Sequence, residues 1–455
     1  MHILLVLLAS MTIASGQAET KAYQDVVDRI VETALACKTD HRLLKELSAL
    51  GPRLSGYPGY LAAVSWAEST LKTIGCDRVW RQPVTVPYWR RGPVETAEIV
   101  GSAKFTGRSL AIAALGGSPG TAGKPLTGGV IEVNPYTQLE QLDSLVRDRI
   151  VFFNEPYDHR ILRTFEAYSK AVRQRSEGPV AAAKLGAAAA IVRSVTSRDD
   201  NVPHVGGVHR DSLVKPIPAV AIGVTDAEFL SSALQLDPDL QIELNLSCEN
   251  LGAAQSYNVI GEIRGSIYPD EIIVVGGHLD SWDKGHGAHD DGAGCIQSMA
   301  VLGLFKKLKI KPKRTIRCVL FAEEERRQSG ANAYAARSDS LKEQHFAAIE
   351  SDRGAFTPRG FYVESDSAIT QGVQKFLPYL QSAGIDWIRK GGSGANISKI
   401  NNIKAKIGYV PDDQRYFDFH HSDNDTFDTV NPRELALGTA AIAVLTYLIS
   451  EAGIE

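Results

Sequence analysis

The sequence predicts an α/β fold, a mixed, largely parallel sheet flanked by helices, with an inserted domain. Beyond about residue 255, short apolar strands alternate with helical patterns, which is typical of a parallel sheet covered on both faces. Between about residues 105 and 250 the pattern changes to short strands, turns and a small-residue helix, which indicates a separate unit. With 455 residues, of which 44% are hydrophobic and 22% charged, the chain is long enough for two domains with their own cores.

The chain divides into four predicted segments: a signal peptide at 1–18, the first part of the main domain at 19–105, the inserted domain at 106–252, and the rest of the main domain at 253–455. The signal peptide is predicted from an apolar run between Ile3 and Ala14, too short to span a bilayer, followed by small residues up to Ala18. We therefore expect a secreted protein, either extracellular or lysosomal.

The strands and helices are predicted from apolar runs and their periodicity. Residues 22–75 show helical patterns with a glycine-rich break between Gly51 and Gly59. In the inserted section we expect strands at 149–153, 189–192 and 217–222 and a helix at 180–190. In the last section we expect strands at 271–275, 315–322, 346–349 and 405–410, and helices at 295–308 and 370–382. Residues 401–420 are harder to interpret.

Charge and the C-terminal segment argue against nucleic acid and membrane partners. The net charge is −4, so no overall basic field attracts nucleic acid or an anionic membrane. The apolar stretch from Leu435 to Ile449 is interrupted by Gly438 and follows Asn431-Pro432, which supplies a helix cap and a first-turn proline. We expect a helix packed on a domain and no membrane span.

The five cysteines show no spacing typical of a thiolate metal site, and their odd number leaves at least one free thiol. Cys318 lies in an apolar strand and is expected in the core. A bridge between Cys37 and Cys76 is one option, although connectivity does not follow from sequence.

Metal-type side chains follow three predicted strands at their carboxyl ends. His278 follows one strand, Glu323-Glu324-Glu325 follow the next, and Asp352 follows the third. In an open α/β sheet, such positions converge on one edge, where these folds place their sites. A glycine-rich loop with Asp290-Asp291 continues from the first of these strands, and His420-His421 lie in a late loop.

Each of these features alone is ordinary, since an Asp-Asp pair beside glycine is usually a turn and a glutamate triplet is usually a solvated surface. Together they indicate a metal site. Imidazole and carboxylate ligands without thiolates suit catalytic zinc, with cobalt or manganese as substitutes. Two metals side by side need a shared carboxylate, and Asp290 is the natural bridge.

Five motifs resemble the co-catalytic zinc aminopeptidase superfamily and, within it, the carboxypeptidase Q (plasma glutamate carboxypeptidase) group. They are His278-Leu279-Asp280-Ser281-Trp282-Asp283, Asp290-Asp291-Gly292, the double glutamate, Glu350-Ser351-Asp352 and Phe419-His420-His421-Ser422. The resemblance runs from about residue 22 to the C-terminus, with the motifs in the matching order. It implies the zinc exopeptidase fold and a protease-associated-type inserted domain.

The resemblance implies two zinc ions per chain, with Asp290 as the bridging ligand. His278 and Asp352 would complete one zinc site, Glu325 and His421 would complete the other, and Glu324 would be the general base. Two choices of register remain. Glu323 as base with Glu324 as ligand is the rival register, disfavoured by the position of Gly330. His420 could replace His421, although the pattern His421-Ser422-Asp423-Asn424-Asp425-Thr426 selects His421.

Two further aspartates are expected to support the ligands. Asp280 would orient the imidazole of His278, because metal-bound histidines donate their other ring N–H to an acceptor. Asp291 follows the bridging ligand directly, and the resemblance implies a cis peptide bond between Asp290 and Asp291.

Three departures from the family pattern fall near the expected substrate site and leave the specificity open. They are Asn396 where relatives usually carry aspartate, the basic stretch Lys399–Lys406, and Arg326-Arg327 where small residues are common. Glycosylation sequons start at Asn245, Asn396 and Asn424, and Asn245 is the best candidate.

The leading hypothesis is a secreted two-zinc dipeptidase or carboxypeptidase that acts on short peptides. An aminopeptidase with the same metals is a close alternative, to be separated by peptides with blocked termini. A glutaminyl-cyclase-like enzyme would use one zinc, and a non-catalytic relative would have lost ligands, so metal content separates these readings. A homodimer is expected from the resemblance alone.

Overall fold

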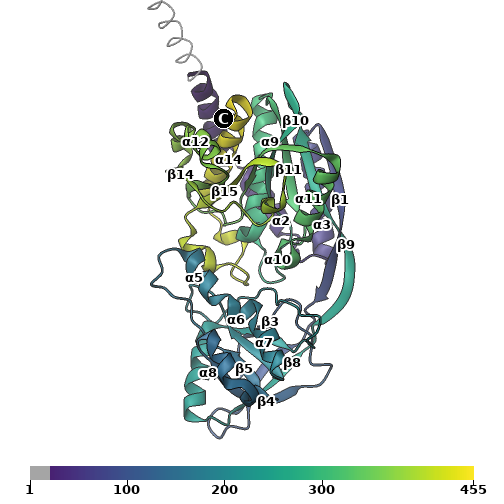
Figure 1. Cartoon of the computed structure of the whole chain (residues 1–455), viewed down its shortest axis with the longest axis vertical. Helices are drawn as coiled ribbons and strands as arrows, with labels where there is room; N and C mark the ends of the chain where they lie inside the picture. Colours follow the sequence, from purple (N-terminus) through teal and green to yellow (C-terminus); the bar gives the residue numbers. More distant parts are fainter. Residues whose placement is uncertain (1–20, 455) are drawn as a thin grey trace, which may run out of the picture.

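The computed structural model describes residues 21–454 and places them around two β-sheets (Figure 1). The predicted signal peptide at 1–18 lies outside the described residues. The larger sheet has the strand order β1-β9-β11-β10-β12-β15-β13-β14. Its strands are β1 (Arg78–Arg90), β9 (Glu249–Ile263), β10 (Tyr268–His278), β11 (Arg314–Phe321), β12 (Gln344–Glu350), β13 (Pro358–Glu364), β14 (Trp387–Lys390) and β15 (Ile403–Pro411).

The centre of this sheet is parallel and its flanks contain antiparallel pairs. Strands β11, β10, β12 and β15 run in the same direction, whereas β9 joins β11, and β13 joins β15, in antiparallel fashion. The mixed, largely parallel sheet predicted from the sequence is thereby confirmed. Because the central strands are parallel, the chain leaves each of β10, β11 and β12 at the same edge.

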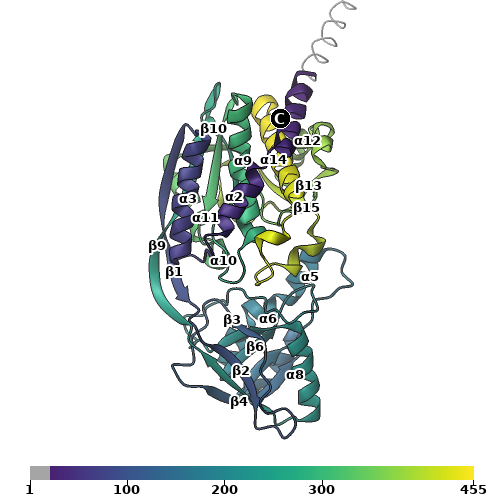
Figure 2. The ribbon, with the colours of Figure 1, turned by 180° about the vertical axis from the view of Figure 1, so that it is seen from behind.

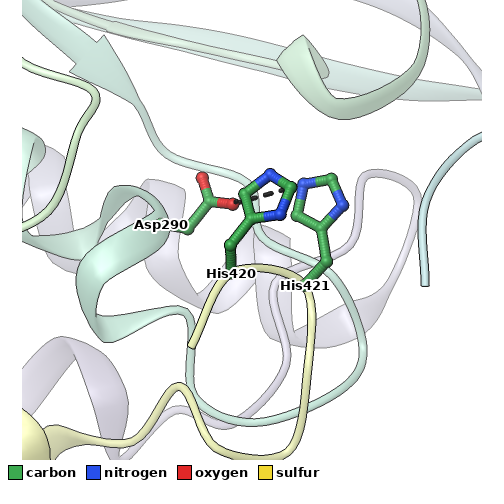
Figure 3. Close-up of side chains that lie close together, drawn as sticks. All are labelled: Asp290, His420 and His421. Carbon is green, nitrogen blue, oxygen red and sulfur yellow. Dashed lines mark ion pairs between the residues drawn. The ribbon is translucent and has the colours of Figure 1, made fainter. Parts of the chain in front are cut away.

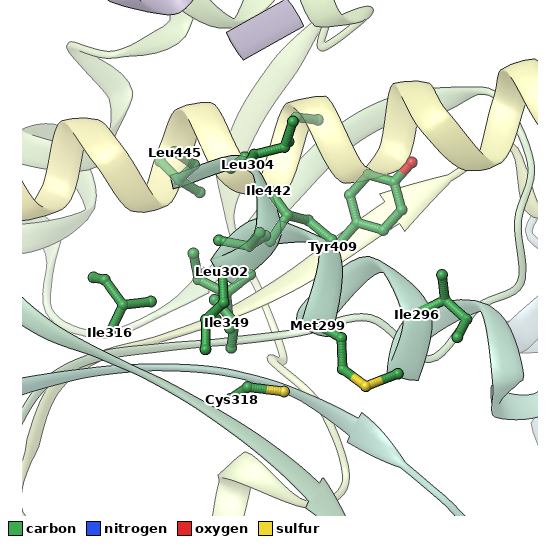
Figure 4. Packing of buried hydrophobic residues seen from close by; sticks show 14 of the residues in the cluster. Ile296, Met299, Leu302, Leu304, Ile316, Cys318, Ile349, Tyr409, Ile442 and Leu445 are labelled. Carbon is green, nitrogen blue, oxygen red and sulfur yellow. The ribbon is translucent and has the colours of Figure 1, made fainter. Parts of the chain in front are cut away.

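Helices cover both faces of the sheet, which explains why its strands are apolar on both sides. In β10, Ile273 and Val275 belong to a core shared with α9 and α14, while Ile272 and Val274 pack on the opposite side with Tyr334 of α11. Figure 4 shows α9 and α14 packed on the strands in the first core. The helices on the first face are α2 (Thr39–Ser48), α3 (Pro58–Ile74), α9 (Ala293–Leu308) and α14 (Pro432–Ala452), and α11 (Ser329–Leu341) lies on the second.

The C-terminal helix α14 is a core helix of this fold. It is the one helix among the described residues that is long enough and apolar enough to cross a membrane. However, 83% of its apolar window is buried inside the protein. It contacts α9 along the core, as Figure 4 shows for Ile442 and Leu445. The side chain of Asn431 caps its start, accepting hydrogen bonds from the backbone N–H groups of Arg433 (2.9 Å) and Glu434 (3.3 Å).

The smaller sheet lies in the lower part of Figures 1 and 2. Its strand order is β2-β8-β4-β5-β6-β7-β3, and β4 to β7 are parallel neighbours. The strands are β2 (Glu95–Val100), β3 (Ile112–Ala114), β4 (Leu126–Val133), β5 (Ile150–Phe153), β6 (Ala189–Arg193), β7 (Ala219–Ile222) and β8 (Gln241–Leu246). Helices α5 (Thr164–Ala171), α6 (Arg173–Ser176), α7 (Gly178–Lys184) and α8 (Val224–Leu236) accompany them.

The smaller sheet is an insertion between two paired strands of the larger one. The chain leaves the larger sheet after β1, builds the smaller sheet, and returns in β9, which pairs with β1 from Arg90↔Glu249 to Arg78↔Glu262. Strand β2 already belongs to the smaller sheet, so this sheet begins before residue 106, where the sequence had placed the boundary. Leu54 and Trp89 pack into the core of the smaller sheet, which therefore takes residues from both sides of that boundary.

Three local features differ from the sequence-based expectations or complete them. The helix expected at 180–190 ends at Lys184, because Gly186 takes a left-handed φ of 85° and β6 begins at Ala189. All five cysteines are free, so the bridge considered between Cys37 and Cys76 is wrong. Residues 401–420, which are harder to interpret from sequence, form β15 and the short helix η6 (Asp413–Asp418).

Candidate metal centre

Three neighbouring strands deliver the predicted ligands to one edge of the larger sheet. His278 is the last residue of β10, and it pairs with Phe321 at the end of β11. Glu324 follows β11 after a two-residue turn, and Asp352 follows β12 after one residue. The side chains therefore meet because the parallel register aligns the ends of the strands, as the sequence pattern predicted.

Asp290 lies at the centre of the cluster, with one carboxylate oxygen on each side. Its Oδ1 is 3.2 Å from His278 Nε2, which is also 3.4 Å from Asp352 Oδ1. Its Oδ2 is 3.3 Å from His421 Nε2, which is also 3.0 Å from Glu325 Oε2. Each oxygen of Asp290 thus faces its own histidine and carboxylate, which is the arrangement that a carboxylate bridging two metals requires.

His420 and His421 both point toward Asp290 (Figure 3). His420 Nε2 lies 3.7 Å from Asp290 Oδ2, and its ring stacks on that of His421 with centroids 3.4 Å apart. Only His421 also reaches Glu325, and its Nδ1 lies 3.0 Å from the backbone carbonyl of Val205. An imidazole that donates Nδ1–H to a carbonyl presents its Nε2 lone pair to a metal, so the geometry favours His421 as the ligand.

The three side chains of the glutamate triplet point to different places. Glu323, with a left-handed φ of 57°, turns its carboxylate to Ser329 at the start of α11, accepting a hydrogen bond from the Ser329 N–H at 3.2 Å. Glu325 reaches His421, and Glu324 lines the cavity over the centre. This geometry favours Glu324 as base and Glu325 as ligand over the rival register.

Asp280 connects the first histidine to the glutamates. His278 Nδ1 lies 3.0 Å from the backbone carbonyl of Asp280 and 3.6 Å from its carboxylate, so the carbonyl is the direct acceptor. The Asp280 carboxylate instead accepts from the backbone N–H of Glu324 (3.1 Å) and of Glu325 (3.5 Å). The expected support of His278 therefore comes from the main chain of Asp280, and its side chain holds the glutamate turn.

Asp291 supports the ligands from behind. Its carboxylate accepts hydrogen bonds at 3.0 Å from the backbone N–H of His278 and of Gly294. Burial, with Asp352 close by, raises the pKa of Asp291 well above its ordinary value. The peptide bond between Asp290 and Asp291 is cis, as the resemblance implied.

The donor set fits metal ions. Asp290 Oδ2 and Glu325 Oε1 are buried and accept no hydrogen bond from any of residues 21–454. Burial raises the pKa values of Glu324, Glu325 and Asp352, and the negative charge of neighbouring carboxylates raises them further. Burial alone would lower the pKa of His421, but Glu325 and Asp290 outweigh it and raise it to about 10. A cation in place of these protons would satisfy the same oxygens and nitrogens.

A cavity of about 230 Å³ opens over the centre. It is lined by the predicted base Glu324 and by all the predicted ligands except His278, together with four aromatic side chains: Phe165, Tyr168, Tyr416 and Phe417. Two of these aromatics come from α5 in the inserted unit and two from η6 in the main unit. A peptide carbonyl that enters the cavity would reach the metal ligands and Glu324 together.

Sequence reasoning missed two residues that hold the Asp290 loop. The buried carboxylate of Asp425 accepts from the backbone N–H groups of Ala288 (3.0 Å), His289 (2.7 Å) and Asp290 (3.1 Å). Buried Arg53 donates to the carbonyls of Leu279 (2.9 Å), His286 (2.6 Å) and Gly287 (2.9 Å). Asp425 was present in the quoted histidine motif, whereas Arg53 lies in a glycine-rich break that carries no periodic signal.

Asn396 does not line the cavity over the centre, although its neighbours Gly394 and Ala395 line another cavity, beside Asp352. It is fully buried, and its Nδ2 donates to Glu350 Oε1 at 3.0 Å. Ile397 N–H donates to the other Glu350 oxygen at 2.8 Å. Asn396 therefore supports the segment before Asp352, and its burial excludes a glycan at that sequon.

Comparisons with known proteins agree with the motifs. Residues 258–446 match peptidase family M28. Carboxypeptidase Q from Bos taurus is 33% identical over 438 residues, covering 95% of this chain and 90% of that protein. Carboxypeptidase Q from Xenopus laevis is 34% identical over 452 residues, covering 96% and 91%.

Solved structures share the fold. A peptidase M28 precursor from Shewanella amazonensis superposes with a TM-score of 0.91 at 33% identity, covering 96% of this chain and 98% of that one. The zinc aminopeptidase BSAP from Bacillus subtilis has a TM-score of 0.66 at 17% identity, covering 91% and 95%, and shows the fold alone. Full-length similarity to these proteins and the M28 match together identify the chain as a metallopeptidase that belongs to peptidase family M28 and to its carboxypeptidase Q group.

Proposed function

We propose that this chain is a two-zinc exopeptidase that splits dipeptides or releases a terminal amino acid from short peptides. The observation that carries the proposal is the position of Asp290, whose two oxygens face His278 with Asp352 on one side and His421 with Glu325 on the other. A site for a single metal would not need this doubled set. The names of the carboxypeptidase Q relatives support a peptide substrate.

His278 and Asp352 would hold one zinc, His421 and Glu325 the other, and Asp290 would bridge them. When bound, the zinc ions would act as Lewis acids that lower the pKa of a water molecule and polarise the peptide carbonyl. The carboxylates of Asp280, Asp291 and Asp425 accept hydrogen bonds from backbone N–H groups in the three segments that carry the base and the ligands. These bonds hold the three segments of the site in place.

Glu324 is positioned to move the proton. Its side chain lines the same cavity as Asp290 and Asp352, and its backbone N–H is held by Asp280 at 3.1 Å. We assign it the removal of a proton from the attacking water and the return of that proton to the leaving amine. Gln328 Nε2 lies 3.4 Å from Glu324 Oε1 and orients the carboxylate without neutralising it.

The same centre would suit an aminopeptidase equally well, so the direction of cleavage has to be determined by testing substrates. The test uses Ala-Ala, its N-acetylated form and its C-terminal amide, with zinc content recorded for every protein. A dipeptidase cleaves Ala-Ala and loses activity when either end is blocked, whereas an aminopeptidase tolerates the amide and a carboxypeptidase tolerates the acetyl group.

Glu324→Gln, with Glu323→Gln as matched control, tests the assignment of the base. We expect Glu324→Gln to keep about two zinc ions and to lose at least 100-fold in kcat, in the range of general acid–base contributions. Glu323→Gln should keep most of its activity, because Glu323 turns toward Ser329. The reverse pattern, or absence of bound zinc in the wild type, would refute the assignment.

Export and dimerisation are also proposed. The apolar segment at Ile3–Ala14 supports export to the extracellular space or a lysosome. Deletion of residues 1–18 should keep the protein inside the producing cell, and secretion of the deleted form would refute the signal peptide. A homodimer rests on the family resemblance, and sedimentation at micromolar concentration would detect a monomer if the proposal is wrong.

A further inference from the structure

A second cavity, of about 560 Å³, opens beside the Glu325–His421 half of the centre. Apart from these two residues, its ionisable side chains are basic: Arg175, His209, Arg210, Arg326 and Arg327. Three of the basic residues come from the inserted unit and two follow the catalytic glutamates directly in sequence. We call this space the arginine cavity.

The guanidinium groups of the arginine cavity have neutral hydrogen-bond partners, although Glu325 also lines the cavity and Glu323 lies near Arg326. Among the described residues, none of its four guanidinium groups lies within 4.0 Å of a carboxylate oxygen. Arg326 donates to the backbone carbonyl of Pro87 at 3.3 Å, and Arg175 donates to that of Val205 at 2.9 Å. Arg210 donates to the side-chain oxygen of Asn250. These partners are neutral, so none of the three arginines has an ion-pair partner among the described residues.

Burial makes the charge of Arg175 costly. Arg175 is only 5% exposed, and its buried Nε has no hydrogen-bond partner among residues 21–454. Burial and the charge of Arg327 lower the pKa of Arg210. An anion in the cavity would remove the cost.

The opposite side of the centre has the opposite character. A cavity of about 450 Å³ beside Asp352 is lined by Glu350, which is buried and accepts from Asn396 at 3.0 Å, and by Glu364, which has Lys406 as a partner at 3.9 Å. Its arginine, Arg353, already has Asp413 as a partner at 3.8 Å. A substrate that lies across the centre therefore meets acidic groups at one end and basic groups at the other. This polarity matches the free amine and the carboxylate of a short peptide.

We propose that the arginine cavity binds a carboxylate group of the substrate and selects for peptides that carry one beyond the cleaved bond. The inference deepens the proposed exopeptidase function and rests on it. The carboxylate is either the C-terminal one or that of an Asp or Glu side chain, since both offer the same planar pair of oxygens to guanidinium groups. Arg326 and Arg327 directly follow Glu325 in the sequence. Because one residue spans at most about 3.3–3.6 Å of extended chain, a carboxylate one residue beyond the cleaved carbonyl remains close to the centre.

Binding to the zinc-loaded Glu324→Gln protein tests the inference without relying on hydrolysis. Calorimetry with Ala-Ala against its C-terminal amide measures recognition of the terminal carboxylate. Ala-Glu against Ala-Gln measures recognition of a side chain. We expect at least one pair to differ by about 10- to 100-fold in Kd in favour of the carboxylate, the value of a charge-assisted hydrogen bond to a buried group.

The variant Arg326→Gln/Arg327→Gln, made in the same background, should remove most of that preference and leave the neutral peptides within about twofold. Arg337→Gln is the matched control, because Arg337 is exposed on α11 and does not line the cavity. If the double variant does not fold, Arg327→Gln alone, at an exposed position, takes its place.

Equal affinities within both peptide pairs, or a preference that survives the double variant, would overturn the inference. Neither result depends on turnover, so failure of the proposed exopeptidase function is detected separately, as a zinc-loaded wild type that cleaves none of the four peptides.

Discussion

Removal of the Asp425 carboxylate is expected to destabilise the loop that carries the bridging ligand. In Asp425→Ala, the buried N–H groups of Ala288, His289 and Asp290 lose their acceptor together. A buried donor without a partner costs about 1–3 kcal/mol, and one water molecule in the vacated space can satisfy one of the three. Two remaining losses give an expected destabilisation of about 2–6 kcal/mol. Because Asp290 is displaced, zinc affinity should also fall by about 10- to 100-fold.

Urea unfolding of zinc-depleted protein measures the first effect, and zinc titration of the folded protein measures the second. Asp425→Asn should be milder, since its amide oxygen still accepts from part of the loop. Asp423→Ala is the control: its side chain is 58% exposed and holds Gly285 N–H at 3.1 Å and Lys284 at 3.6 Å, so its loss should cost less than about 1 kcal/mol. If Asp425→Ala costs no more than Asp423→Ala, the loop does not depend on this carboxylate and the reasoning is refuted.

Three further predictions address the metals, pH and packing. Asp290→Asn should lower the zinc content from about two ions to fewer than one, whereas His278→Ala should keep about one, by elemental analysis; equal losses would contradict a bridging role. Burial raises the pKa of Asp40 to about 6. The free energy of unfolding of the wild type, relative to that of Asp40→Asn, should therefore fall as pH rises from about 4 through 6, and the total loss at pH 8 should be about 3 kcal/mol. The same difference in unfolding free energy between the two proteins at pH 5 and at pH 8 would contradict this. Gly330→Ala places a Cβ 2.3 Å from Asn258 Oδ1 and 2.4 Å from Ala322 N, so we expect a loss of about 1–3 kcal/mol in urea unfolding, and an unchanged midpoint would mean that the close approach is relieved.

The sequence predicted the features that depend on local pattern. The strands that become β10, β11 and β12 are continuous apolar runs, and the ligand types at their ends follow from the parallel sheet. Once these strands were assigned, His278, Glu324 and Asp352 had to meet at one edge, because strand direction and register determine which residues share an edge. The site was accessible to sequence reasoning for this reason.

Contacts between distant segments were not accessible in the same way. Arg53 binds three carbonyls that lie more than 220 residues away in the chain, and nothing in its own segment has a period that identifies a partner. The buried hydrogen bond between Asn396 and Glu350, 46 residues apart, was not predicted for the same reason. Polar pairs of this kind depend on three-dimensional proximity that hydrophobic periodicity does not encode.

The role of the inserted unit is the clearest example of a feature that sequence motifs did not predict. The sequence contains no histidine–carboxylate cluster with a fixed spacing there, so no motif indicates a chemical role for this unit. Yet Val205 exchanges two hydrogen bonds with His421, its N–H donating to the His421 carbonyl at 2.9 Å and its carbonyl lying 3.0 Å from Nδ1. His204 Nδ1 also lies 2.7 Å from the His420 carbonyl. His421 has a left-handed φ of 63°, which is uncommon for a residue with a side chain. The backbone of the inserted unit therefore holds this histidine in an unfavoured conformation and fixes which ring nitrogen faces the metal site. The inserted unit contributes to the chemistry through main-chain atoms, which no residue-type motif can report.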